Sequence, residues 1–226
     1  MPNFNNRSCS WLSLVVVAGL ITSCLFLSNW QVHRFQEKQS WVNLQSKNLN
    51  QPTLYNLPKK LKVELEGQKF AINGRIDFKR VFLRDNTYYK HKAGYLVYAP
   101  VQSNNTWYLA NLGWLEKNKK LNKKQVNPIV GSIYCPKGKE FYLKKIKSPK
   151  GWPKIIQTLD LSEVNATLGQ DVGQCLLIVK TDLKTIINQK PLSPERHLGY
   201  AFQWLLFACI ILYIFLRVTR SQNESP

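Results

Sequence analysis

Two long apolar stretches constrain this chain more strongly than any other feature of its 226 residues. Residues 11–30 contain no charged side chain, and residues 197–216 contain none unless His197 takes up a proton. A helix needs about 20 apolar residues to cross a hydrocarbon layer about 30 Å thick. A helix of a soluble protein is rarely apolar on all sides over such a length. We therefore predict two transmembrane helices, at residues 11–30 and 197–218.

The first apolar stretch also resembles a cleaved leader. It follows Arg7, and its ITSC sequence, which ends at Cys24, is similar to the cleavage box of a bacterial lipoprotein. Apolar residues continue beyond this box as LFLSNW, whereas a mature lipoprotein usually becomes polar there. We favour an uncut span in a bacterial inner membrane, and a lipoprotein cut before Cys24 is the alternative.

The segment between the two spans is strongly basic. Residues 31–196 carry 29 Lys and Arg against 12 Asp and Glu, a net charge of +17. Such a charge is typical of nucleic-acid binding, but no nucleic-acid motif accompanies it. A domain anchored at both ends lies beside a membrane, where lysines attract anionic lipid. We expect membrane lipid as a partner and no nucleic acid.

The charges near the spans leave the orientation open. The loop side carries more Lys and Arg close to the membrane than the two chain ends do. By the positive-inside rule this would place the loop in the cytoplasm, but the rule is weak for loops longer than about 60 residues.

Short runs rich in Val, Ile and aromatic residues fill the region between the spans. The polar stretch 31–49 lacks Gly and Pro and predicts a helix that continues out of the first span. Strands are then predicted in KFAINGRIDF, VFLRD, GYLVYAPV, TWYLANLGWL, SIYC, EFYLKKI and CLLIVKTD. A helix is predicted between the last two strands, with its start near Leu161 and its end at Gly169. The fold class is an α+β membrane protein, in which residues 31–196 form an extracytoplasmic antiparallel sheet or small barrel with one or two helices.

Cysteines and catalytic motifs are uninformative in this region. Its two cysteines, Cys135 and Cys175, show no metal-binding spacing, and we expect two unpaired buried thiols rather than a disulfide. The region also lacks the motifs of Ser hydrolases, zinc proteases and phosphate loops. We expect a protein that is not an enzyme, with a lysine-rich exposed loop at KNKKLNKK.

Several motifs occur in the order found in a known family. The first span ends in SNWQVHR, the middle region contains INGRIDF and GYLVYAPV followed by WYLANLGWL, and the second span opens with RHLGYAFQW. In this order the chain resembles the Surfeit locus protein 1 family, the cytochrome c oxidase assembly factors, over about residues 27–207. Leu112 and Gln203 stand where the family usually has Arg and Thr.

This resemblance implies a role in maturing subunit I of the oxidase, at the insertion of haem a. It implies two spans with both termini in the cytoplasm and the β-rich region in the periplasm. It also implies that His197 binds haem a and that the partners are subunit I and the machinery that supplies this haem. A membrane-tethered scaffold or binding module without haem is the alternative function.

Elementary chemistry agrees with a ligand role for His197. A neutral imidazole is a usual axial ligand of haem iron, and Tyr200 and Trp204 share a helix face with His197. We expect these three residues to line the haem site, with the iron bound through His197. His33 at the exit of the first span is a possible second haem contact, and a histidine that merely lies at the lipid headgroups is the alternative for His197.

Overall fold

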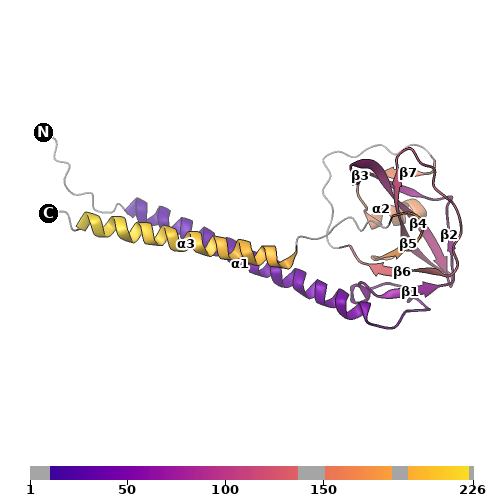
Figure 1. Ribbon diagram of the computed structural model, residues 1–226, viewed down its shortest axis with the longest axis horizontal. Coiled ribbons are helices and arrows are strands. Elements are labelled where there is room, and N and C mark those ends of the chain that lie inside the picture. Colours follow the sequence, from indigo (N-terminus) through magenta and orange to yellow (C-terminus); the bar gives the residue numbers. More distant parts are fainter. Residues whose placement is uncertain (1–10, 137–150, 185–192, 224–226) are drawn as a thin grey trace. The chain divides into compact units, whose positions relative to one another are not determined.

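The computed structural model describes residues 11–136, 151–184 and 193–223 (Figure 1). The chain divides into two compact units, which we call the helical unit (up to Val42, and from Gln189) and the sheet unit (Asn43–Asn188). Helix α1 (Trp11–Leu49) begins in the helical unit, and its last turns belong to the sheet unit. The polar stretch 31–49 therefore continues the first apolar helix without a break, as predicted.

The helical unit consists of α3 (Pro194–Asn223) beside the greater part of α1. Both helices are long and apolar enough to cross a membrane. Large apolar side chains such as Phe26, Phe202 and Tyr213 point outward and are largely exposed. Exposed side chains of this kind are costly in water and favourable against lipid. Pro194 occupies the first position of α3, where its missing N–H costs no hydrogen bond.

The sheet unit contains one eight-stranded sheet. Its strands are β1 (Lys69–Ile72), β2 (Arg75–Ile76), β3 (Phe82–Tyr89), β4 (Lys92–Ser103), β5 (Thr106–Glu116), β6 (Ile129–Tyr134), β7 (Lys154–Ile156) and β8 (Leu176–Val179). The order across the sheet is β1-β6-β8-β5-β4-β3-β7, and β2 pairs with β4. Each described segment predicted as a strand contains one, whereas EFYLKKI lies outside the described residues.

The predicted antiparallel sheet is wrong in part, because the sheet is mixed. β8 pairs in parallel with β5, and β7 pairs in parallel with β3. Parallel pairing requires a long crossover connection, and the chain between β5 and β8 includes β6, β7 and helix α2 (Leu161–Leu168). The hairpin between β4 and β5 turns at Asn104 and Asn105, which both have positive φ, as hairpin turns of this type demand.

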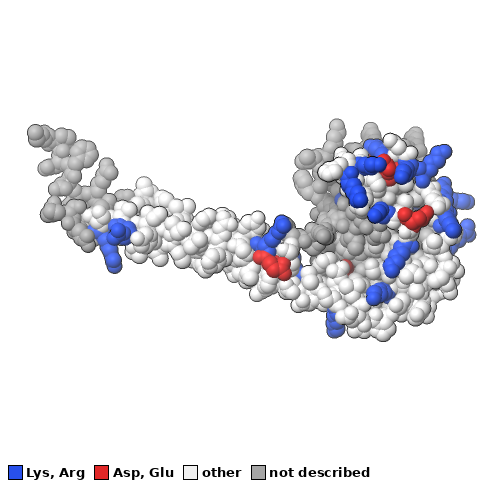
Figure 2. All heavy atoms as spheres, in the orientation of Figure 1, with Lys and Arg blue, Asp and Glu red and all other residues white. Residues whose placement is uncertain are grey.

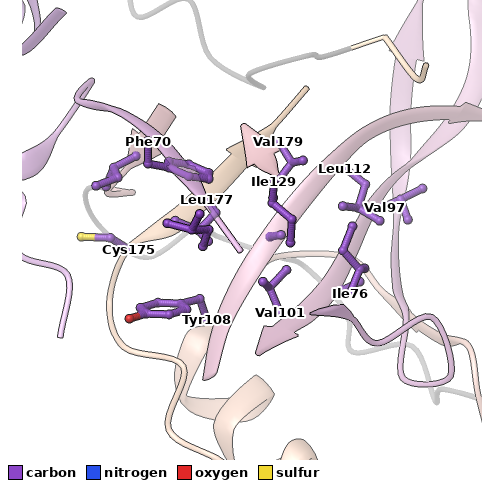
Figure 3. Packing of buried hydrophobic residues seen from close by; sticks show 14 of the residues in the cluster. Phe70, Ile76, Val97, Val101, Tyr108, Leu112, Ile129, Cys175, Leu177 and Val179 are labelled. Atoms are coloured by element: carbon purple, nitrogen blue, oxygen red, sulfur yellow. The ribbon is translucent and has the colours of Figure 1, made fainter. Parts of the chain in front are cut away.

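Alternate residues of the central strands serve two separate cores. On β5, Tyr108 and Ala110 face one core, whereas Leu109 and the partly buried Trp107 face the other. The first core also contains Phe70, Ile129 and Leu177 (Figure 3). α2 covers the second core with Val164 and Leu168. Burial on both sides explains why β4 and β5 are almost continuously apolar.

Helix α2 begins and ends as its sequence predicts. The carboxylate of Asp160 accepts hydrogen bonds from the backbone N–H groups of Ser162 and Glu163, so Asp160 is the N-cap. Gly169 ends the helix with a left-handed conformation (φ 64°).

Cys135 and Cys175 form a disulfide, so the expectation of two unpaired thiols is wrong. The reason lies in the register of two strands. Tyr134 of β6 pairs with Leu176 of β8, so the next residue outward on each strand is a cysteine. Their Cα atoms lie 4.1 Å apart, close enough for a bridge. Cys24 and Cys209 are free.

Lys and Arg side chains are scattered over the face of the sheet unit that Figure 2 shows. The lysines of KNKKLNKK are exposed between β5 and β6, as expected. Leu121 within this run packs against the first core, and the Asn122 amide donates a hydrogen bond to Asp182 over 3.0 Å. The loop is therefore attached to the sheet unit at its centre.

Candidate functional site

The candidate site lies where α1 and α3 pack side by side in the helical unit. Ser28 Oγ donates a hydrogen bond to the carbonyl oxygen of Ala201 over 2.9 Å. One turn further along α1, Gln31 bonds to His197, which precedes Ala201 in the chain. Because the contact moves forward along α1, from Ser28 to Gln31, as it moves backward along α3, the two helices run antiparallel.

Small residues allow this close approach. Ala201 and Ala208 are only 4% and 5% exposed, and Cys24 on α1 is 7% exposed. Small side chains at a helix contact let two backbones come close together, and a serine can then bond across the contact. The seven-residue spacing of Ala201 and Ala208 keeps both on one face of α3. The two alanines are therefore buried in the contact with α1.

His197 has one ring nitrogen engaged and one without a partner. Its Nδ1 lies 2.7 Å from Oε1 of Gln31. Its Nε2 is buried and has no hydrogen-bond partner among the residues that the structure describes. An amide oxygen only accepts hydrogen bonds, so the Gln31 oxygen at this position favours the tautomer of His197 in which Nδ1 carries the proton. Nε2 then retains its lone pair, which is the form of imidazole that binds a metal.

The side chains of the other predicted site residues differ in how far they are exposed. Trp204 is half-buried on the same face as His197, and its ring meets Phe207 edge-on at a centroid distance of 5.8 Å. Tyr200 is 50% exposed and lies at the rim of this face. His33 is exposed. The structure thus brings His197 and Trp204 together on the packed face and leaves Tyr200 and His33 outside it.

Gln31 is the site residue that sequence reasoning did not single out. It directly follows Trp30, within the SNWQVHR match to the family, and that position was the available signal. The sequence alone does not show that Gln31 contacts His197, and an uncharged amide at the end of a span has no other property that indicates a function.

Cations follow Gln31 along α1. Arg34 bonds to Glu37 over 2.9 Å and lies over the Trp30 ring, 5.6 Å from its centroid. Lys38 is half-buried one turn further on. Among the residues that the structure describes, no cluster of three or more His, Cys, Asp or Glu could hold a bare metal ion.

Comparison with known proteins identifies the family of this chain. The family model described as SURF1 family matches residues 18–209. The match contains Gln31, His197, Tyr200 and Trp204, and it includes the whole sheet unit. A search of curated proteins finds no match. Since the matched region covers most of its length, the chain belongs to the SURF1 family, which is associated with cytochrome c oxidase assembly and is generally not catalytic.

Proposed function

We propose that this protein assists cytochrome c oxidase assembly by holding haem a for insertion into subunit I. Its partners are then subunit I and the machinery that supplies haem a. The observation that carries the proposal is the state of His197, whose Nε2 is buried and has no hydrogen-bond partner within the described parts of the chain.

The chemistry of His197 fits an iron ligand. A buried polar atom without a partner has lost its hydration and received nothing in return, which costs about 1–3 kcal/mol. Haem a, when bound, would supply an iron that accepts the lone pair of Nε2. Trp204 and Tyr200 offer aromatic surface on and beside the same face of α3.

A ligand reaches Nε2 only after a local movement. Nε2 is enclosed, and Ala201 and Ala208 are buried in the contact with α1. Either the imidazole turns outward or the two helices separate at this point. This closed contact favours a second candidate function, a membrane-tethered scaffold that holds a partner protein and binds no haem.

In this proposal the protein lies in a bacterial inner membrane, with both termini in the cytoplasm and the sheet unit in the periplasm. The disulfide between Cys135 and Cys175 supports this orientation. Disulfides persist in the periplasm and are rare in the cytoplasm, where thiols are kept reduced.

The visible absorption spectrum of the purified protein tests the haem proposal. Wild type and a His197→Asn variant are purified in detergent from cells that make haem a. We expect the variant to reach normal levels in the membrane, because Asn keeps polarity at the helix start, but to lose the haem band. Asn offers no ring nitrogen to the iron.

His33→Asn is the matched control, because His33 is an exposed histidine near the end of the first apolar stretch. It should keep most of its haem. A His197→Asn protein with its full haem content would refute the ligand assignment. Wild type that carries no haem at all would favour the scaffold.

A further inference from the structure

The contact between Gln31 and His197 assigns a role to the glutamine. We propose that Gln31 is a positioning residue, whose amide oxygen keeps the His197 proton on Nδ1 so that Nε2 meets its ligand as a bare nitrogen. This inference rests on the proposed haem-binding function.

The geometry of the contact is specific. The two atoms lie 2.7 Å apart, at the short end of the range for N–H···O hydrogen bonds. The partners come from different helices and are separated by 166 residues in the chain. Gln31 and His197 are both half-buried in the helical unit, so the bond is partly shielded from solvent.

The surroundings of Nε2 favour the same proton position. If the proton were on Nε2, a buried N–H group would have no acceptor, because Nε2 has no partner among the described residues. The Gln31 oxygen would then face a lone pair on Nδ1, which is repulsive. With the proton on Nδ1, one good hydrogen bond forms and only a lone pair stays unsatisfied.

Such a contact affects metal binding even though Gln31 does not touch the metal. A partner on the remote nitrogen of a ligating histidine fixes the tautomer and the ring orientation and raises the basicity of the ligating nitrogen. Loss of such a partner typically lowers metal affinity about 10–100-fold.

The bond also joins α1 to α3, so a purely structural role must be separated from the positioning role. The chain offers a matched control for this purpose. Ser28 Oγ makes a second hydrogen bond between the same two helices, one turn away, and it bonds to a backbone oxygen instead of to His197. Ser28→Ala weakens the helix pair and leaves the His197 ring untouched.

Two substitutions of Gln31 have opposite expected effects. Gln31→Leu keeps a similar volume and removes the acceptor. Gln31→Glu keeps an acceptor oxygen at the same place and makes the bond charge-assisted. If Gln31 is a positioning residue, Gln31→Leu should lose the Nδ1 proton position and the haem affinity of wild type, and Gln31→Glu should keep both.

The first measurement needs no haem. The full-length protein is labelled with ¹⁵N-histidine, prepared haem-free in detergent, and examined by NMR, which distinguishes protonated from bare ring nitrogens. The chain has three histidines, so the signal that disappears in His197→Asn identifies His197. Wild type, Ser28→Ala and Gln31→Glu should carry the proton on Nδ1, and Gln31→Leu should move it at least partly to Nε2. A wild-type proton on Nε2, or an unchanged Gln31→Leu spectrum, would overturn the inference.

The second measurement is the affinity for haem a, titrated into the same detergent preparations. Gln31→Leu should bind about 10–100-fold more weakly than wild type, whereas Ser28→Ala and Gln31→Glu should bind nearly as well. If His197→Asn abolishes binding and Gln31→Leu binds as wild type does, Gln31 has no positioning role and the proposed function stands. If His197→Asn binds haem fully, the proposed function fails, and the NMR result alone decides the tautomer.

Discussion

At the residue scale, Asp77 and Arg80 form the tightest ion pair described in the sheet unit. Arg80 Nε lies 2.6 Å from Asp77 Oδ2, and the Lys79 N–H donates to Asp77 Oδ1 over 2.9 Å. Burial opposes the charge of Asp77, but the bonds from Arg80 and from the Lys79 backbone outweigh it and lower the pKa of this carboxyl. The Arg80 guanidinium in turn lies 5.0 Å from the centre of the Trp107 ring, which holds it in place. Asp77 lines a surface cleft of about 380 Å³, together with Arg75 and Lys123.

This ion pair predicts an acid-dependent loss of stability. The pKa of Asp77 is lower in the folded state than in the unfolded state, so its contribution is present above the unfolded pKa and is lost as the pH falls through the folded pKa. Asp77→Asn should lower the free energy of unfolding at pH 7 by about 1–3 kcal/mol and should reduce its dependence on pH below about 5. Urea unfolding followed by tryptophan fluorescence at several pH values measures both effects. The exposed Asp182→Asn variant is the control, and an equal pH dependence in Asp77→Asn and wild type would contradict the prediction.

Sequence patterns locate His197 and Trp204 but cannot locate Gln31. The two former residues share a helix face by their spacing of seven, which is visible in the sequence. The bond to Gln31 depends on the register between α1 and α3, which no local pattern encodes.

At the element scale, the end of α1 is tied into the sheet unit by one buried side chain. Asn48 is 6% exposed, and its amide donates to the carbonyl oxygens of Glu64 and Glu66 over 2.6 Å and 2.9 Å. Glu64 belongs to the short helix η1 (Val63–Leu65). The side chain therefore fixes the last turn of α1 against the segment that leads into β1.

Asn48→Ala should destabilise the sheet unit by about 1–3 kcal/mol, because two carbonyl groups lose their donor in a buried place. Asn50→Ala is the matched control, since Asn50 is exposed two residues further on. Thermal unfolding in detergent, followed by circular dichroism in the near ultraviolet, compares the two variants. Equal midpoints for both would show that the Asn48 bonds contribute nothing to stability.

Local sequence patterns predict most helices and strands of the sheet unit, but they do not predict which distant strands pair. The strands around Leu96 and Leu109 and the start and end of α2 follow from composition, caps and turn residues. β7 has only three residues, too few to form a pattern. The parallel pairings and the disulfide depend on where β8 enters the sheet, which is a property of the whole fold.

At the scale of the whole molecule, the disulfide joins segments 40 residues apart. In the chain-entropy model, closing a loop of this length stabilises the fold by about 4 kcal/mol. A Cys135→Ser and Cys175→Ser double variant should therefore unfold at markedly lower urea concentration than wild type. A Cys24→Ser and Cys209→Ser double variant is the control, because these two cysteines are free.

The same disulfide reports the side of the membrane in cells. Wild-type protein should contain it when made in a normal strain and lack it in a strain without periplasmic disulfide formation, as read from alkylated peptides by mass spectrometry. Cysteines that stay reduced in both strains would place the sheet unit in the cytoplasm and contradict the proposed orientation.

The position of β8 determines what an interrupted gene would produce. β8 is the last strand described in the chain, yet it lies between β5 and β6, and no other strand joins those two in the sheet. A ribosome that stops after β6 and before residue 176 therefore leaves the described strands in two separate groups with open edges and no Leu177 or Val179 between them. Open edges of this kind invite aggregation and proteolysis. Stop codons between the end of β6 and the start of β8 should thus be equivalent, with earlier and later ones in this interval giving the same loss of protein.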